Sequence, residues 1–512
     1  MAAYSANDRR LHRSLFGATF LLSFLVLVGP IVVQASPSEP PTETEVAMEP
    51  DTMNQASAVG FWKGEIQVPG QPLGVLISIE EGDGGLVGTA DIPTQGIRDL
   101  PLKDVEQDGA VVRFTLSKIP GSPTFDGKVE GSFLKGDFRQ AGAQFPFELE
   151  RAEPEVSAPP ARPQTPEPPF PYASEDVSIT HGEITLAGTL TLPAGQGPFP
   201  AVALLTGSGP QDRDSTVFEH KPFLVLADHL TRAGIAVLRF DDRGHAESTG
   251  DRAVATGSDF ADDALAVVGF LTGRDEIDAE RVGLVGHSEG GTVALVAAAR
   301  SDTVRFVVSL AGPSVSGVEV LPAQAEAIAV AGGAPAMAAG MQAQIYRKTL
   351  EKVVAAESPE AARELLLSEG RTQLLAAKGA QGQEAEISDD EEGTILEQAA
   401  ALTSPWMLHF LKYDPAEALA EIDVPVLALN GSLDLQVLPD QNLPPFREAF
   451  AASGHGDATV EALDGLNHLF QPTETGSPSE YFEIETTLDP VLLDRVTAWI
   501  LERFGSAASN GD

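Results

Sequence analysis

The chain has 512 residues, of which 43% are hydrophobic, so it can bury more than one core and is expected to form two or three domains. Its 75 acidic residues outnumber its 33 Lys and Arg, and the net charge of −42 argues against nucleic acid as a partner. The sequence has no Cys, which excludes disulfides, thiol nucleophiles and thiolate metal sites.

The first 35 residues carry the features of an export signal. Three arginines precede an apolar run over residues 15–33, and Ala35 provides the small residue that a signal-peptidase site requires. The run is also long enough to span a membrane once. Two alternatives therefore stay open for residues 1–35, a cleaved signal peptide or a retained membrane anchor. Both place the rest of the chain outside the cytoplasm, in the periplasm or the extracellular space.

Three segments follow before the largest domain. Residues 36–57 are rich in Pro, Glu, Thr and Ser and are interpreted as a disordered tether. Residues 58–151 form short alternating segments separated by glycine turns, which predict an antiparallel β-domain, either a small barrel or a sandwich, with Trp62 in its core. Clustered prolines then predict a semi-extended linker with no face to bury over residues 152–173.

A different rhythm begins at residue 174 and continues to residue 508. Apolar runs alternate with amphipathic helical segments, which is typical of an α/β domain whose mostly parallel sheet is covered by helices on both faces. In such sheets the chemistry lies at the carboxyl ends of the strands. The runs that predict the strands are residues 201–205, 235–240, 281–285, 306–310, 424–429 and 458–463.

Between about residues 314 and 412 this rhythm breaks into stretches rich in Ala, Leu and Glu. We expect a helical insertion here that acts as a lid. It contains an acidic run at residues 384–392, which ends in four consecutive carboxylates. Calcium-binding loops space their carboxylates and carry a turn glycine, and this run has neither feature, so we interpret it as an exposed acidic loop.

The segment Gly286-His287-Ser288-Glu289-Gly290 carries the strongest chemical signal. A Gly-x-Ser-x-Gly pattern alone is weak, but this one directly follows a predicted strand and opens a predicted helix. Such a turn strains and exposes the serine, and only small flanking residues avoid a clash. Ser288 is therefore predicted to be a nucleophile, against the alternative of a plain glycine turn.

A serine hydroxyl is a poor nucleophile at neutral pH and needs a base within hydrogen-bond reach. When the nucleophile lies on a strand-to-helix turn, the base comes last in the chain, which leaves His409, His455 and His468 of the nine histidines. His409 belongs to the predicted lid, and His455 precedes the last strand, at the wrong edge of the sheet. His468 follows that strand and is predicted to be the base, with a structural histidine as the alternative.

The third member of such a triad is a carboxylate that orients the imidazole. Asp434 follows the strand at residues 424–429, and Asp440 is the runner-up. An Asx-turn role is the alternative for Asp434. For the oxyanion we predict two backbone N–H donors, that of Glu289 at the start of a helix and that of Ser208 in a glycine-rich loop.

Residues from about 174 to 508 resemble the serine α/β-hydrolase superfamily, and within it the bacterial carboxylesterases and serine aminopeptidase-like hydrolases that carry an N-terminal β-domain. The motifs behind the resemblance are residues 207–214 (GSGPQDRD), 239–244 (RFDDRG), 286–291 (GHSEGG) and 430–434 (NGSLD). The resemblance implies an α/β-hydrolase fold and a bracing role for Asp212–Asp214. It also implies the site residues Ser288, Asp434 and His468 as a triad, with Ser208 and Glu289 in the oxyanion hole.

The expected reaction is hydrolysis of a small-molecule carboxylic ester through an acyl-enzyme on Ser288, with no metal or organic cofactor. A serine in this position disfavours dehalogenase and epoxide hydrolase chemistry, which needs a carboxylate there. The alternatives are a serine peptidase or aminopeptidase that acts on short peptides, and a non-catalytic envelope-binding protein. The sequence indicates neither the oligomeric state nor the role of the β-domain.

Overall fold

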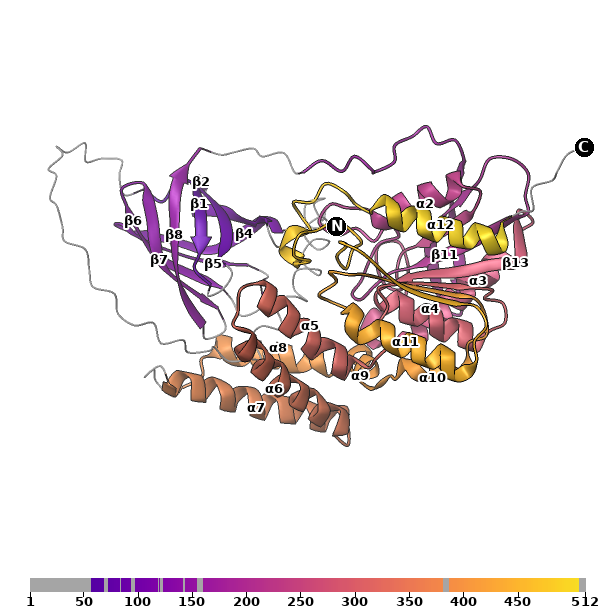
Figure 1. Ribbon diagram of the computed structural model, residues 1–512. Coiled ribbons are helices and arrows are strands. Elements are labelled where there is room, and N and C mark those ends of the chain that lie inside the picture. Colours follow the sequence, from indigo (N-terminus) through magenta and orange to yellow (C-terminus); the bar gives the residue numbers. More distant parts are fainter. Residues whose placement is uncertain are drawn as a thin grey trace, which may run out of the picture. The chain divides into compact units, whose positions relative to one another are not determined.

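The computed structural model describes residues 57–505, apart from residues 69–71, 83, 94–96, 118, 120–122, 141–142, 154–159 and 381–385. The predicted signal or anchor segment at residues 1–35, with its apolar run, lies outside the described residues. The chain divides into two compact units (Figure 1). The barrel unit comprises Met1–Ala158, Gly332–Ala338 and Glu364–Ala400, and the sheet unit comprises Pro159–Ala331, Ala339–Arg363 and Ala401–Asp512.

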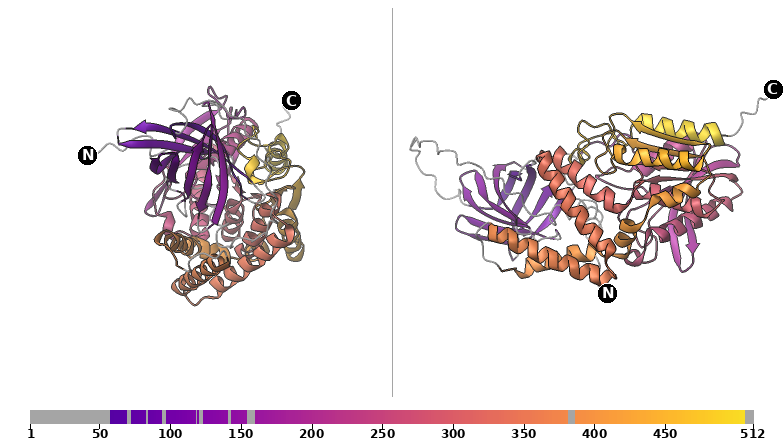
Figure 2. Two further views of the ribbon diagram at one scale, coloured as in Figure 1. Left: turned by 90° about the vertical axis from the view of Figure 1, so that its left-hand side faces the viewer. Right: turned by 60° about the horizontal axis from the view of Figure 1, so that its bottom comes forward.

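Eight antiparallel strands form a closed barrel in the first of these units (Figures 1 and 2). Each strand pairs with the next along the chain, and the last pairs with the first, where Trp62 lies opposite Arg151. The predicted antiparallel β-domain is therefore a barrel and not a sandwich. The strands are β1 (Gly60–Ile66), β2 (Leu73–Gly82), β3 (Gly85–Ile92), β4 (Ile97–Asp108), β5 (Val111–Leu116), β6 (Thr124–Glu130), β7 (Phe133–Gln140) and β8 (Ala143–Ala152).

Aliphatic and aromatic side chains fill the interior of the barrel, since every second residue of a strand points to that face. Phe125 is 1% exposed and stacks on Phe114 with ring centroids 4.7 Å apart. The rings of Phe138 and Phe147 meet it edge-on, each at 4.9 Å. Trp62 is fully buried in the same cluster, as its predicted core role requires.

Part of the acidic run lies in a helix, so the prediction of an exposed loop is only partly right. The helix α8 (Asp389–Leu402) follows α7 (Pro359–Ala380). Glu391 of α8 forms an ion pair with Lys378 of α7 at 2.7 Å, and Glu392 pairs with Arg371. These basic partners on the preceding helix neutralise carboxylates that have no basic residue next to them in the sequence.

The sheet unit is built on an eight-stranded sheet with the order β16-β15-β14-β13-β11-β12-β10-β9. The strands β11 to β16 pair parallel with one another. At the other edge, β10 pairs antiparallel with β12 and β9 pairs antiparallel with β10. The strand bounds are β9 (Ala173–His181), β10 (Ile184–Leu192), β11 (Phe199–Leu205), β12 (Ala236–Phe240), β13 (Ile277–His287), β14 (Val307–Leu310), β15 (Val426–Gly431) and β16 (Ala458–Leu463).

Helices cover both faces of this sheet, as Figure 1 shows. Alternate residues of β11 belong to two different hydrophobic cores, one on each face of the sheet. Ala203 packs in the first core and Val202 in the second. The first core contains residues of α3 (Gly257–Thr272), α4 (Glu289–Arg300), α10 (Pro415–Glu421) and α11 (Pro439–Ser453). The second contains residues of α2 (Pro222–Arg232) and α12 (Pro490–Phe504). This is the α/β-hydrolase fold that the sequence predicts.

The predicted lid region is helical. It consists of α5 (Gly317–Ala331), α6 (Ala336–Ala355), α7, α8 and α9 (Pro405–Lys412). Its residues are shared between the two units, with α9 in the sheet unit. Within the described part of the chain, no helix is both long and apolar enough to cross a membrane.

The second half of the predicted linker is attached to the sheet unit, which the sequence did not suggest. Arg162 donates hydrogen bonds to the carbonyls of Phe482 and Phe218, at 2.7 and 3.0 Å. The side chain of Gln164 accepts hydrogen bonds from the backbone N–H groups of Thr487 and Leu488. A proline-rich stretch lacks an apolar face, but its few long polar side chains suffice here to fasten it to a domain.

We expect Phe125→Ala to lower the local stability of the barrel by about 3–5 kcal/mol, because it removes the ring at the centre of the aromatic cluster. Lys128→Ala, at an exposed position of the same strand, should change stability by less than about 0.5 kcal/mol. Hydrogen exchange of β5–β7 peptides, read by mass spectrometry in the full chain, measures both. Equal protection in the two variants would contradict an aromatic core.

Candidate active site

The predicted nucleophile lies on a strained turn between β13 and α4. Ser288 has φ 55° and ψ −124°, a backbone conformation that costs on the order of 1–3 kcal/mol for a residue with a side chain. The turn needs glycine on both sides: a Cβ on Gly286 would lie 2.0 Å from the carbonyl oxygen of Gly290, and one on Gly290 would lie 2.3 Å from that of Leu205. The geometry presents the serine at the carboxyl edge of the sheet.

The predicted base and acid are hydrogen-bonded to each other. His468 Nδ1 lies 2.8 Å from Asp434 Oδ2, and both side chains are almost completely buried. The other carboxylate oxygen of Asp434 accepts the backbone N–H groups of Gln436 and Val437 at 2.8 and 2.9 Å. The carboxylate is therefore held in one orientation, with Oδ2 left to receive the imidazole N–H. That contact fixes the tautomer that leaves His468 Nε2 unprotonated and able to act as a base.

His287, which sequence reasoning passed over, links the base to the nucleophile turn. Its Nε2 lies 2.9 Å from the backbone oxygen of His468, and the two imidazole rings have centroids 4.8 Å apart. Burial lowers the pKa of His287 to about 4, so the ring is neutral at pH 7. A neutral ring that meets a carbonyl through Nε2 must carry its proton there. Two histidines in contact therefore avoid mutual charge repulsion.

The predicted oxyanion loop follows β11 and passes beside the nucleophile. A Cβ on Gly207 would lie 3.2 Å from the Cβ of Ser288, so a larger residue at position 207 would crowd the serine. Ser208 comes next in the loop, and Glu289, the other predicted donor, begins α4. Backbone N–H groups at a helix start have no partner within the helix and suit a developing negative charge.

Charged pairs brace the chain beyond this loop. Arg213 binds Asp241 through two side-chain contacts, the shorter of 2.7 Å, and through its backbone N–H at 2.8 Å. Asp214 forms an ion pair with Arg239. The pairs join the segment after the oxyanion loop to the end of β12, in line with the bracing role that the resemblance implies.

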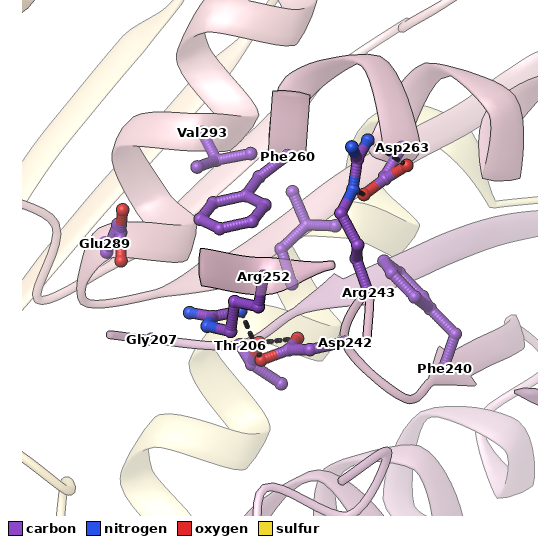
Figure 3. Close-up of a pocket in the computed structure, with 11 residues that line it drawn as sticks. Thr206, Gly207, Phe240, Asp242, Arg243, Arg252, Phe260, Asp263, Glu289 and Val293 are labelled. Atoms are coloured by element: carbon purple, nitrogen blue, oxygen red, sulfur yellow. Dashed lines mark hydrogen bonds and ion pairs between the residues drawn. The ribbon is translucent and has the colours of Figure 1, made fainter. Parts of the chain in front are cut away.

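The side chain of Glu289 lines a small cavity of about 30 Å³ beside the oxyanion loop (Figure 3). Thr206, Gly207 and Arg252 also line it. Glu289 Oε1 accepts the indole N–H of Trp406, from the helix α9, at 2.6 Å. Its Oε2 is buried without a hydrogen-bond partner in the described structure. Burial raises the pKa of Glu289 to about 7, opposed by the Trp406 hydrogen bond and the charge of Arg252.

The rejected candidates lie elsewhere. His455 bonds the backbone oxygen of Val424, before β15 begins, which is the opposite edge of the sheet. His409 stacks on Tyr413 after the end of α9. Asp440 lies exposed in the first turn of α11. Among the described residues, no group of three or more His, Asp or Glu is arranged to hold a metal ion.

The chain is similar to known hydrolases. Residues 182–456, more than half of the chain, match the family model described as X-Pro dipeptidyl-peptidase (S15 family). The chain is 27% identical over 332 residues to the esterase EstD of Thermotoga maritima, an alignment that covers 65% of this chain and 68% of that protein. It is 26% identical over 224 residues to an uncharacterised 31.7 kDa protein of Escherichia coli, which covers 42% and 68%. Among solved structures, the α/β hydrolase GrgF from Penicillium sp. sh18 matches with 17% identity and a TM-score of 0.39, over 65% of this chain and 100% of that chain.

We expect Glu289 to make the stability of the sheet unit fall as pH rises. Because its pKa is raised in the folded state, folded protein between about pH 4.5 and 7 holds a proton that unfolded protein has released. The free energy of unfolding therefore falls as the pH rises through that window, and it changes little above it. Between pH 5 and pH 8 the free energy of unfolding should fall by roughly 1–3 kcal/mol more in the unsubstituted protein than in Glu289→Gln, because the amide of Gln does not titrate. Calorimetry at the two pH values measures this difference, and parallel pH profiles for the two proteins would contradict it.

Proposed function

We propose that this hydrolase, which belongs to the X-Pro dipeptidyl-peptidase (S15) family, cleaves carboxylic esters through an acyl-enzyme formed on Ser288. The observation that carries the proposal is the buried 2.8 Å contact between His468 and Asp434, at the sheet edge where Ser288 occupies its strained turn. Such a set of groups activates a serine for attack on a carbonyl carbon.

In the proposed reaction, the Oγ of Ser288 attacks the ester carbonyl while His468 accepts the hydroxyl proton. The carbonyl oxygen becomes an oxyanion, which the backbone N–H groups of Ser208 and Glu289 stabilise. His468 then gives its proton to the departing alkoxide, and the alcohol leaves. His468 then deprotonates a water molecule, which attacks the acyl-enzyme and forms a second tetrahedral intermediate. When this intermediate collapses, His468 returns the proton to Ser288 and the acid is released. Asp434 stays ionised throughout and stabilises the imidazolium.

Esters are proposed over amides because the relative EstD, which aligns with 65% of this chain, is named an esterase. The family description favours a second candidate, a serine peptidase that acts on short peptides. Both reactions use the same groups and differ in the leaving group, an alcohol or an amine. A non-catalytic role is not favoured, because an idle fold has no need to keep all three triad positions.

We also propose that the protein is exported, on the strength of the apolar run at residues 15–33 and the arginines before it. Its substrate would then be a small ester met outside the cytoplasm. Fractionation of expressing cells tests this, and recovery of the protein in the cytoplasm would contradict it.

The purified protein should hydrolyse 4-nitrophenyl acetate and butyrate, and Ser288→Ala should lower kcat/KM by at least about 10⁴-fold, because the acyl-enzyme cannot form. Ser301→Ala, at the far end of the same helix, should retain activity. Aminoacyl 4-nitroanilides, assayed alongside, distinguish the candidates. Turnover of the anilides without turnover of the esters would replace the ester proposal by the peptidase, and activity that survives Ser288→Ala would refute the assigned nucleophile.

A further inference from the structure

Asp242 holds both ends of the oxyanion loop. It follows β12 at the carboxyl edge of the sheet and is 8% exposed. Its Oδ1 accepts the hydroxyl of Thr206 at 2.5 Å, and its Oδ2 accepts the backbone N–H of Gln211 at 2.8 Å. Thr206 and Gln211 enclose the short segment that contains Gly207 and Ser208. One buried carboxylate thus anchors the loop where it begins and where it ends.

The hydrogen bonds continue from Asp242 into the loop itself. The backbone N–H of Asp242 donates to the carbonyl of Gln211 at 3.1 Å, so the two residues are bonded reciprocally. The side chain of Gln211 then donates to the carbonyl of Ser208 at 3.2 Å and accepts the hydroxyl of Ser215 at 2.6 Å. This chain of contacts fixes the peptide group that follows Ser208.

Arg252 supplies the charge that a buried carboxylate requires. Its Nη1 lies 3.1 Å from Asp242 Oδ2, a contact drawn in Figure 3, and its guanidinium lies 4.6 Å from the centre of the Phe260 ring. Burial raises the pKa of Asp242 to about 6, and Arg252 and the hydrogen bonds oppose that rise. At neutral pH the carboxylate is therefore ionised and accepts hydrogen bonds at both oxygens.

We propose that Asp242 is a positioning residue for acyl transfer, which holds the backbone N–H of Ser208 where the oxyanion forms. This inference rests on the proposed serine mechanism and extends it to a residue that does not touch the substrate. Oxyanion donors stabilise the developing charge when they lie about 2.7–3.1 Å from it, and a small displacement from that position weakens the stabilisation. A loosened loop therefore weakens binding of the transition state and leaves binding of the substrate almost unaffected. Loss of the Asp242 carboxylate should for this reason lower kcat rather than raise KM.

Asp263 provides a matched control, because it lines the same small cavity as Asp242 and Glu289. Asp263 is also buried, at 3% exposed, and binds Arg243 through two contacts of 2.8 and 2.9 Å. These contacts join α3 to the segment after β12 and do not involve the oxyanion loop. Asp263→Asn therefore removes a buried carboxylate from the same cavity while leaving the contacts of Thr206 and Gln211 in place.

The test compares Asp242→Asn with Asp263→Asn in the full chain. Three quantities are measured: the rate at which a fluorophosphonate labels Ser288, kcat and KM on 4-nitrophenyl butyrate, and the Ki of a trifluoromethyl ketone that forms a tetrahedral oxyanion on the serine. For Asp242→Asn we expect kcat to fall by about 10- to 100-fold with KM within about 3-fold, slower labelling, and a Ki raised by about the factor lost in kcat/KM. Asp263→Asn should keep kcat and Ki within about 3-fold of the native values.

Thr206→Val tests the same idea without changing a charge, should Asp242→Asn fail to fold. It removes one of the two loop anchors and should lower kcat by about 3- to 10-fold. Unchanged kcat in the folded anchor variants would overturn the proposal, as would an equal loss of kcat in Asp263→Asn or a loss confined to KM. If the native protein is labelled but hydrolyses no ester, the ester assignment fails, and the labelling rates of the variants still decide the role of Asp242.

Discussion

The backbone of Ser288 occupies a region of φ and ψ that a residue with a side chain avoids unless its surroundings enforce it. Three contacts enforce it here. The Ser288 N–H donates to the carbonyl of Leu310 at 2.8 Å, its carbonyl accepts the N–H of Gly291 at 2.9 Å, and Gly290 packs against the end of β11. The strain is therefore carried by the centre of the sheet, where the strands are buried on both faces.

Near that turn, buried carboxylates are stabilised by specific hydrogen-bond donors. Although the chain has a net charge of −42, two buried carboxylates at the carboxyl edge have hydrogen-bond donors at both of their oxygens. Asp434 has two backbone N–H groups and an imidazole, and Asp242 has a hydroxyl, an amide and a guanidinium. Glu289 departs from this rule, since one of its oxygens has no partner among the described residues. Burial raises its pKa, because a buried carboxyl group is more stable in its uncharged form.

Local sequence patterns were sufficient for the strands and helices that carry the site. The apolar run at residues 281–285 lies inside β13, and the glycines around Ser288 indicated the turn because they are needed locally. Contacts between distant residues were not predictable in this way. Closure of the barrel depends on the pairing of β1 with β8, and Trp406 meets Glu289 across 117 positions of the chain. The attachment of the linker's second half was not predictable for the same reason, because Arg162 binds Phe482, which lies 320 positions away.

The order of strands in the sheet also bears on how the molecule is made. From β13 onward, each new strand joins the free edge left by the one before it, in the sequence β13, β14, β15, β16. No later strand has to be inserted between two that are already paired, so this half of the sheet can assemble in the direction in which a ribosome delivers it. Asp434 arrives after β15 and His468 after β16. A nascent chain would thus carry its serine without the acid and the base until β16 has joined the sheet and the segment that contains His468 has followed it.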